Sequence, residues 1–292
     1  MSQATLRTAH PTILSARVRG VSLTERLGPL GLAAAAALTV LVLLAVLAPL
    51  IAPFDPDEPD LLNVLADPGG AHLLGTDALG RDILSRLLWG ARLTLAGPGL
   101  VILVSTVVGA AIALVAAWFG GTVDMVLSWI LDILFAVPGI VFALIAVAIF
   151  GPSFSTVIGG LVIAYIPYVA RVVRGAALRE RSLPYVSAAW LQGQRGSSIM
   201  LRQLLPNLRS LIIAQSVSSL GFAVIDLAAV SFLGLGVQPP TADLGLMVKS
   251  GFDSVLRGFF TEAATAGTLI VLIVLCVTVI GDRLNASARS TR

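Results

Sequence analysis

The chain has 292 residues, of which 57% are hydrophobic and only 12% are charged. Because an average soluble domain carries about 25% charged residues, this composition excludes a soluble globular domain and a disordered chain. The single cysteine, Cys276, cannot form an internal disulfide, and the single lysine, Lys249, is not part of a Gly-Lys-Ser/Thr phosphate-binding loop. The composition therefore predicts a membrane protein without a P-loop nucleotide site.

Six stretches are apolar and long enough to cross a bilayer, which takes about 20 residues of helix. They lie near residues 32–52, 94–118, 126–150, 154–173, 211–233 and 263–281. Gly151-Pro152-Ser153 separates the third from the fourth, and Pro138 and Pro167 are expected to kink the spans that contain them. The first stretch follows a long arginine-containing segment, so we interpret it as an uncleaved anchor. The predicted fold class is an all-α polytopic membrane protein with six transmembrane helices, its permease domain covering residues 32–281.

The charged residues between the spans are distributed unevenly. Fourteen of the nineteen basic residues lie in the tail 1–31, the segment 171–209 and the tail 282–292. Ten of the sixteen acidic residues lie in the two opposite loops, 53–92 and 234–262. Because basic residues are enriched in cytoplasmic loops, both termini are predicted to be cytoplasmic. This distribution explains the basic charge balance without nucleic-acid binding.

The basic segment 174–209 contains signals for two short helices. Pro184 suits a first helical turn, and residues 185–192 are compatible with a helix that ends at Gly193. A second helix is expected to start at Ser197 or Ser198 and to stop before Pro206. This unit has a plausible size for the groove of another protein, and an amphipathic hairpin on the lipid headgroups is the alternative.

One run in this segment resembles the EAA loop of bacterial ABC importer permeases. It reads Tyr185-Val186-Ser187-Ala188-Ala189-Trp190-Leu191-Gln192-Gly193, followed by Leu205-Pro206-Asn207. The positions that match the motif are Ala188, Ala189, Gly193, Leu205 and Pro206. Ser187 stands where glutamate is usual, and Gln203 stands where an aliphatic residue is usual.

Two further stretches resemble the C-type permease subunits of the dipeptide, oligopeptide and nickel group. They run from His72 to Asp82 and from Ser231 to Pro240. Members of this group usually have an acid four residues before that serine, but here Leu227 occupies the position and Asp226 lies one residue earlier. The three matching blocks are in order and far apart, so the resemblance covers nearly the whole chain.

The resemblance implies a type I ABC importer permease fold with a cytoplasmic EAA coupling loop, in a bacterial cytoplasmic membrane. The implied partners are a second homologous permease subunit, two cytoplasmic ATPase domains that bind ATP and magnesium, an extracytoplasmic peptide-binding protein, and lipid. The chain is then not itself an enzyme and holds no cofactor or metal. The implied substrates are dipeptides or short oligopeptides, with nickel, glutathione or another small solute as the alternative.

Three groups of residues are candidates for function. The coupling helix would contact the ATPase through Tyr185, Ser187, Ala188, Ala189, Gly193, Leu205 and Pro206. The outer-loop signature, which would dock the binding protein or fold the outer gate, comprises Gly75, Thr76, Asp77, Gly80, Arg81 and Asp82. Asp226 and Asp132 are candidate pathway residues, because an ionised aspartate within a span costs about 2.5–3.5 kcal/mol. A purely structural pairing is the alternative for both aspartates.

Proteins of other classes fit the sequence less well. A secondary transporter would be expected to have discontinuous helices in two inverted repeats, and the sequence has no visible repeat. An intramembrane enzyme needs a base within a span, but His10 and His72 both lie outside the spans. A purely structural assembly factor is disfavoured by the EAA-like register.

Overall fold

The computed structural model describes the backbone of residues 23–290 and the side chains of residues 27–286. Its helices in chain order are α1 (Leu23–Ile51), α2 (Ile83–Phe119), α3 (Gly121–Ala136), α4 (Gly139–Phe150), α5 (Phe154–Arg181), α6 (Pro184–Leu191), α7 (Gly196–Ile199), the π-helical segment η1 (Met200–Leu204), α8 (Leu205–Phe232), α9 (Leu244–Val255) and α10 (Thr261–Ser290). The predicted tail 1–31 lies mostly outside the described residues, whereas most of the predicted tail 282–292 belongs to α10.

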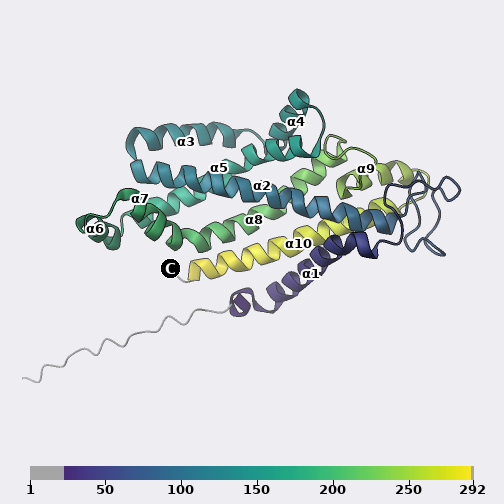
Figure 1. Cartoon of the computed structure of the whole chain (residues 1–292), viewed down its shortest axis with the longest axis horizontal. Coiled ribbons are helices and arrows are strands. Elements are labelled where there is room, and N and C mark those ends of the chain that lie inside the picture. Colours follow the sequence, from purple (N-terminus) through teal and green to yellow (C-terminus); the bar gives the residue numbers. More distant parts are fainter. Residues whose placement is uncertain (1–22, 291–292) are drawn as a thin grey trace, which may run out of the picture.

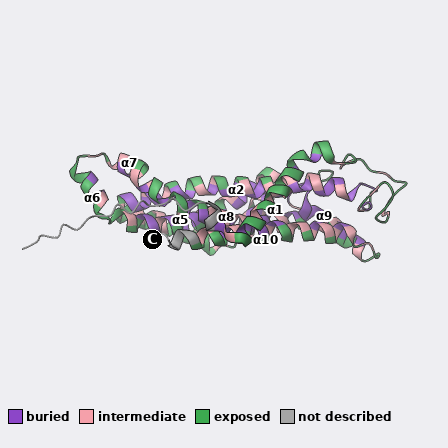
Figure 2. Ribbon diagram, turned by 90° about the horizontal axis from the view of Figure 1, so that it is seen from below, coloured by how far each residue is buried: buried purple, intermediate pink, exposed green. Residues whose placement is uncertain are grey.

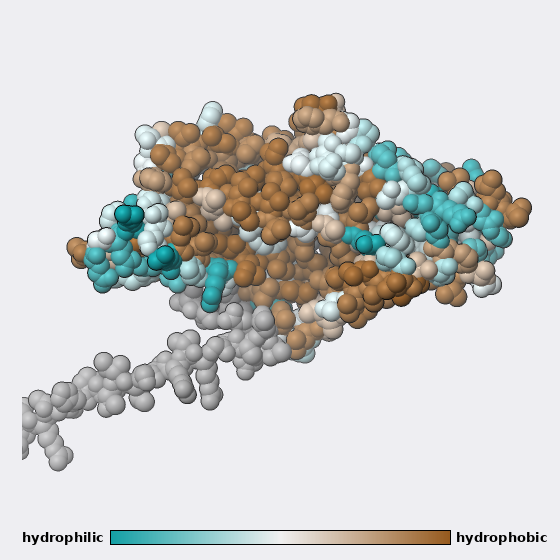
Figure 3. All heavy atoms as spheres, viewed as in Figure 1, coloured by the Kyte–Doolittle hydropathy of each residue, from teal (hydrophilic) through white to brown (hydrophobic). Residues whose placement is uncertain are grey.

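Five long helices form the body of the molecule, and α1, α2, α5, α8 and α10 run along its long axis (Figure 1). In the described part of the chain, five helical segments are long and apolar enough to cross a membrane, and the pair α3 and α4 passes the same test as one broken span. The surface over the middle of the bundle is hydrophobic, whereas both ends are polar (Figure 3). The all-α fold class predicted from the sequence is confirmed.

The third predicted span, 126–150, is not one kinked helix. It is divided into α3 and α4, which meet at 85°. Pro138 lacks a backbone N–H, and its ring disfavours a helical conformation of the preceding Val137, which is extended at φ −95° and ψ 128°. The proline therefore breaks the span, and α4 projects away from the bundle axis (Figure 1).

Two helices extend well beyond the apolar stretches from which they were predicted. The second predicted span began at residue 94, but α2 begins at Ile83 because the Asp82 side chain accepts a hydrogen bond from Ser85 N and caps the helix. The fourth ended at residue 173, but α5 continues to Arg181. The outer loop and the cytoplasmic loop are correspondingly shorter, and the second outer loop, 234–262, contains α9.

The second cytoplasmic helix does not stop before Pro206, contrary to the sequence prediction. Residues 196–232 form one continuous helical segment through α7, η1 and α8. In η1 the Leu205 N–H donates to Met200 O, and this wide π turn makes room for the ring of Pro206. We call α6 and α7 the coupling unit; its second helix, α7, is therefore continuous with the fifth span.

Small residues allow the helices to pack closely. A Cβ atom at Gly109 of α2 would lie 2.8 Å from Ile166 O of α5. A Cβ atom at Gly160 of α5 would lie 2.7 Å from Ala143 Cα of α4. Such backbone contacts are typical of helix pairs in membranes, and the buried residues accordingly face the interior of the bundle (Figure 2).

Candidate functional site

Helix α6 lies with α7 at one end of the molecule and presents two different faces (Figure 1). Val186 and Ala189 are buried against the rest of the chain. Ser187, Ala188 and Leu191 are exposed on the other side, and Leu191 exposes 90% of its surface. Of the predicted contact residues in α6, Ala189 therefore packs inside this chain, while Ser187 and Ala188 are free to meet a partner.

Gly193 ends α6 as the sequence predicted, and the structure gives the reason. Its φ of +75° is in the left-handed region that favours glycine. The Gly193 N–H donates to Trp190 O and the Gln194 N–H donates to Ala189 O, which is the Schellman arrangement of a helix end. A Cβ atom at this position would meet nothing within 4 Å, so the space around Gly193 is open.

The start of α6 is tied to two neighbouring helices. The Tyr185 hydroxyl donates to Glu180 Oε1 at 3.0 Å, and Asn207 Nδ2 donates to both groups at 3.1 Å. Glu180 belongs to the last turns of α5 and Asn207 to the first turn of α8. Leu205 packs against the hydrophobic core that contains Val186 and Ala189 of α6, whereas Pro206 is exposed. Sequence reasoning identified Tyr185 but missed Glu180.

The end of α6 is held by an aromatic contact that sequence reasoning also missed. The rings of Trp190 and Trp118 are stacked, with centroids 5.7 Å apart and planes within 6°. Trp118 lies at the end of α2 and is almost completely buried. Arg181 donates to Ala117 O at 2.7 Å and lies over the Trp118 ring. The coupling unit is thus in direct contact with the ends of α2, α5 and α8.

The outer-loop signature is used to fold this end of the chain. Asp77 is 1% exposed and accepts hydrogen bonds from Arg81 N and Arg81 Nε. Gly75 and Gly80 both have positive φ, and a Cβ atom at Gly80 would lie 1.8 Å from the carbonyl oxygen of Asp60. Thr76, Asp77, Arg81 and Asp82 are all buried. The signature therefore organises the outer loop, and its polar groups are mostly bonded within this chain.

Arg86 joins three segments at the same end, although the sequence did not single it out. It is 1% exposed, and its Nη1 donates to Pro56 O at 2.8 Å and to Pro240 O at 3.3 Å. Its Nε lies 3.5 Å from Asp77 Oδ2. The first turn of α2 is thereby connected to the outer loop and to the segment before α9.

Asp243 caps α9 from a buried position. Its side chain accepts hydrogen bonds from Leu246 N at 3.2 Å and from the Thr94 hydroxyl at 3.1 Å. Burial raises the pKa of the Asp243 carboxyl above its ordinary value, and the hydrogen bonds only partly oppose this effect.

Replacing Asp243 with asparagine should change the pH dependence of stability. A raised pKa means that the Asp243 carboxyl binds its proton more tightly in the folded state than in the unfolded state. The free energy of unfolding therefore falls as the pH rises from the ordinary pKa through the raised pKa. Asp243→Asn should flatten this dependence while keeping the cap, whereas Asp243→Ala should lose about 1 kcal/mol of capping energy. Thermal unfolding in detergent between pH 4 and pH 8 measures both effects, and an unchanged pH profile in the asparagine variant would contradict the assignment.

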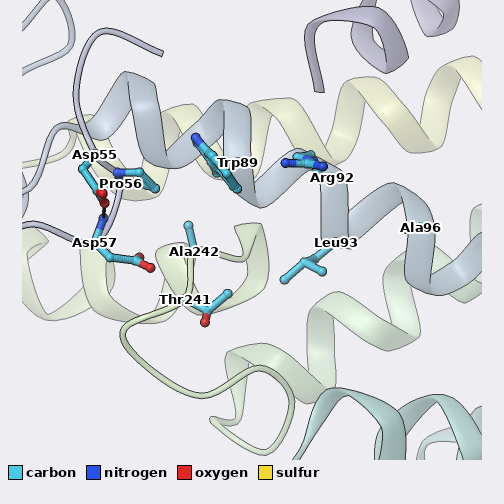
Figure 4. Close-up of a pocket in the computed structure, with 9 residues that line it drawn as sticks. All are labelled: Asp55, Pro56, Asp57, Trp89, Arg92, Leu93, Ala96, Thr241 and Ala242. Atoms are coloured by element: carbon cyan, nitrogen blue, oxygen red, sulfur yellow. Dashed lines mark hydrogen bonds between the residues drawn. The ribbon is translucent and has the colours of Figure 1, made fainter. Parts of the chain in front are cut away.

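A cavity of about 550 Å³ opens between the outer loop, α2 and the segment before α9 (Figure 4). Asp55 and Asp57 line one side of it, and Trp89 and Arg92 of α2 line another. The Arg92 guanidinium lies 4.9 Å from the centre of the Trp89 ring. The cavity is therefore lined by charges of both signs and an aromatic ring, at the end of the bundle opposite α6.

The two candidate pathway aspartates have different partners. Asp132 of α3 accepts a hydrogen bond of 2.7 Å from Arg171 of α5, and both side chains are at least half exposed. Asp226 of α8 accepts a hydrogen bond of 2.8 Å from the hydroxyl of Tyr165 in α5. Within residues 27–286, no hydrogen bond or ion pair joins the two aspartates.

Comparison with known proteins places most of the chain. Residues 105–289 match the family of binding-protein-dependent transport system inner membrane components. The chain belongs to this family. Residues 28–68 of the permease also match the N-terminal transmembrane domain of oligopeptide transport permease C, so the resemblance inferred from the motifs is confirmed.

Individual relatives agree with this assignment. The permease is 37% identical over 218 residues to the glutathione transport system permease protein GsiD of Pectobacterium atrosepticum, covering 75% of this chain and 72% of the relative. It is 33% identical over 219 residues to the dipeptide transport system permease protein DppC of Haemophilus influenzae, covering 74% of this chain and 72% of the relative. An inward-facing structure of the MetNI methionine ABC transporter aligns with a TM-score of 0.56 and 21% identity, over 72% of this chain and 98% of that chain.

The family membership defines the general role of the chain. The permease is a multi-pass protein of the inner membrane and a transmembrane subunit of an ABC importer. Such a subunit works with a second permease subunit and with ATPase partners.

Proposed function

We propose that this permease forms one half of the pore of an ATP-driven importer for dipeptides or short oligopeptides. Both termini lie in the cytoplasm, and an extracytoplasmic binding protein delivers the peptide. ATP and magnesium are bound by the partner ATPases, and this chain contributes no cofactor. The relatives named for dipeptide transport support the substrate class, and the relative named for glutathione transport is compatible with it because glutathione is itself a peptide.

The observation that carries the proposal is the free face of α6. One face of this helix is buried, and its two ends are held by the Tyr185 hydrogen bonds and the Trp190 stack. Its other face exposes Ala188 and Leu191, whose apolar side chains are unfavourable in contact with water. A rigidly held helix with a free apolar face suits docking into a groove of an ATPase, so that movement of the ATPase is passed on to the spans.

Gly193→Trp tests this docking. The φ of +75° strains any side chain at position 193, but no atom of this chain lies within 4 Å of the added Cβ, so the extra bulk of tryptophan over a small residue meets only a partner. Gly193→Asn is the matched control, because asparagine tolerates a positive φ but is much smaller. We expect Gly193→Trp to abolish co-purification of the ATPase and Gly193→Asn to retain it.

The readout is the amount of ATPase that co-purifies with the permease in mild detergent, followed by peptide uptake in proteoliposomes. If Gly193→Trp kept the ATPase bound and transport intact, α6 would not be the docking helix. If the unchanged chain purified without any ATPase, the importer assignment itself would fail.

A further inference from the structure

A strip of polar and aromatic side chains runs along one face of α3, α5 and α8. It begins at the Asp132–Arg171 ion pair, and the Arg171 guanidinium lies 4.0 Å from the centre of the Phe135 ring. Phe135 contacts Tyr168 with ring centroids 4.8 Å apart. Tyr168 in turn contacts Tyr165, with centroids 5.6 Å apart. The strip ends at Asp226, which accepts the hydrogen bond from the Tyr165 hydroxyl.

This strip is partly exposed within the apolar body of the chain. Tyr168 exposes 42% of its surface, and Phe222 and Ile225, which precede Asp226 on α8, expose 68% and 47%. Ionisable groups at membrane depth face protein or water, because contact with lipid leaves their charges without partners. The strip therefore faces the second permease subunit or a water-filled space between the two subunits.

The charge on this face is unevenly compensated. Asp132 is neutralised by Arg171, but within residues 27–286 no cationic side chain forms an ion pair with Asp226. Its Oδ2 accepts from Tyr165, and no described donor reaches its Oδ1. Asp226 thus offers a carboxylate oxygen that no described donor reaches, and Tyr165 connects it to the exposed ring of Tyr168. A carboxylate and an aromatic ring both attract an organic cation.

The backbone near Asp226 leaves room for a ligand. Position 139, where α4 begins after the break at Pro138, is a glycine, and a Cβ atom there would make an ordinary van der Waals contact with Asp226 Oδ2 at 3.5 Å. Because glycine has no side chain, the start of α4 does not cover this side of the Asp226 carboxylate.

We propose that Asp226 binds the positively charged amino group of the peptide as it passes between the two permease subunits, with the Tyr168 ring alongside. This inference rests on the proposed function and adds a contact with the substrate. A peptide amino terminus has a pKa of about 8 and is protonated at neutral pH, so it forms a charge-assisted hydrogen bond with a carboxylate. Tyr165 is a positioning residue, because its hydroxyl fixes the orientation of the carboxylate.

The test uses the complete complex with its binding protein in proteoliposomes, and radiolabelled dialanine as the probe. Asp226→Asn removes the charge but retains an oxygen that accepts from Tyr165, so the fold is preserved. Asp226→Glu restores the charge. The matched control is Ser216→Ala, which removes a 2.8 Å contact between Ser216 of α8 and Thr106 of α2 in the same bundle without changing charge.

We expect Asp226→Asn to reduce the number of peptides transported per ATP about tenfold or more, because the peptide loses one charge-assisted hydrogen bond. Asp226→Glu should recover most of this loss, and Ser216→Ala should stay close to the unchanged complex. Equal uptake by Asp226→Asn and the unchanged complex would overturn the inference, as would an equal loss in the control. If even the unchanged complex assembled but moved no dialanine, the peptide-importer proposal would fail instead.

Discussion

Replacing Arg86 with methionine is expected to destabilise the outer end of the permease by about 3–5 kcal/mol, the usual cost of removing one partner from a buried charged network. Methionine keeps much of the volume but donates no hydrogen bond. The carbonyl oxygens of Pro56 and Pro240 then lose their buried donor, and Asp77 loses one of its two nearby arginines. The outer loop, α2 and the segment before α9 would no longer be held together by a shared group.

Thermal unfolding of the purified chain in detergent measures this effect, and Arg92→Met is the control. Arg92 lies less than two turns further along α2, is only half-buried and contacts the Trp89 ring. Its replacement should cost at most about 1 kcal/mol. If both variants unfolded at the same temperature, Arg86 would not be the group that holds this end together.

Replacing Trp190 with alanine is expected to uncouple ATP hydrolysis from transport. The end of α6 is held by the stack on Trp118, and an aromatic pair contributes about 0.5–1.5 kcal/mol beyond the area it buries. Its loss would shift the balance between a held and a detached α6 by up to roughly tenfold. Peptide uptake per ATP hydrolysed in proteoliposomes should fall accordingly.

Two further variants distinguish the stack from direct contact with the ATPase. Trp190 is 54% exposed, so its ring also presents surface to a partner, whereas Trp118 is buried. Trp118→Ala should therefore reproduce the uncoupling, and Trp190→Phe should retain most of the coupling. Normal coupling in Trp118→Ala would show that α6 is not held through this contact.

Local signals in the sequence were sufficient for the order of the long apolar helices and for the limits of α6, but not for α9 or for the division of the third span. Pro184 and Gly193 act within one turn of their own positions, and both lie at the predicted ends of that helix. Hydropathy located apolar stretches but not helix ends, because α2 and α5 continue into charged sequence. The resemblance to EAA loops also did not indicate which face of α6 is buried, so the burial of Ala189 is seen only in the structure.

Contacts between distant segments were beyond the reach of sequence reasoning. Pro138 signalled a kink, but the 85° bend also depends on how α4 packs against α5. Trp118 and Trp190 are 72 positions apart, and Tyr165 and Asp226 are 61 apart, so no local pattern connects them. The outer-loop signature was expected either to dock the binding protein or to fold the outer gate, and the burial of Asp77 and its bond to Arg81 could not be seen in the sequence.

The continuous segment from Gly196 to Phe232 also has a mechanical consequence. Its 37 residues form a rod about 55 Å long at 1.5 Å per residue, attached at one end to the coupling unit. A rod of that length acts as a lever: tilting it by about 10° displaces its far end by roughly 10 Å. The coupling unit and the far end of α8 belong to one helical segment, so a tilt imposed at α7 would be transmitted along α8 to Phe232. The two ends of the bundle are in this way joined by a single element.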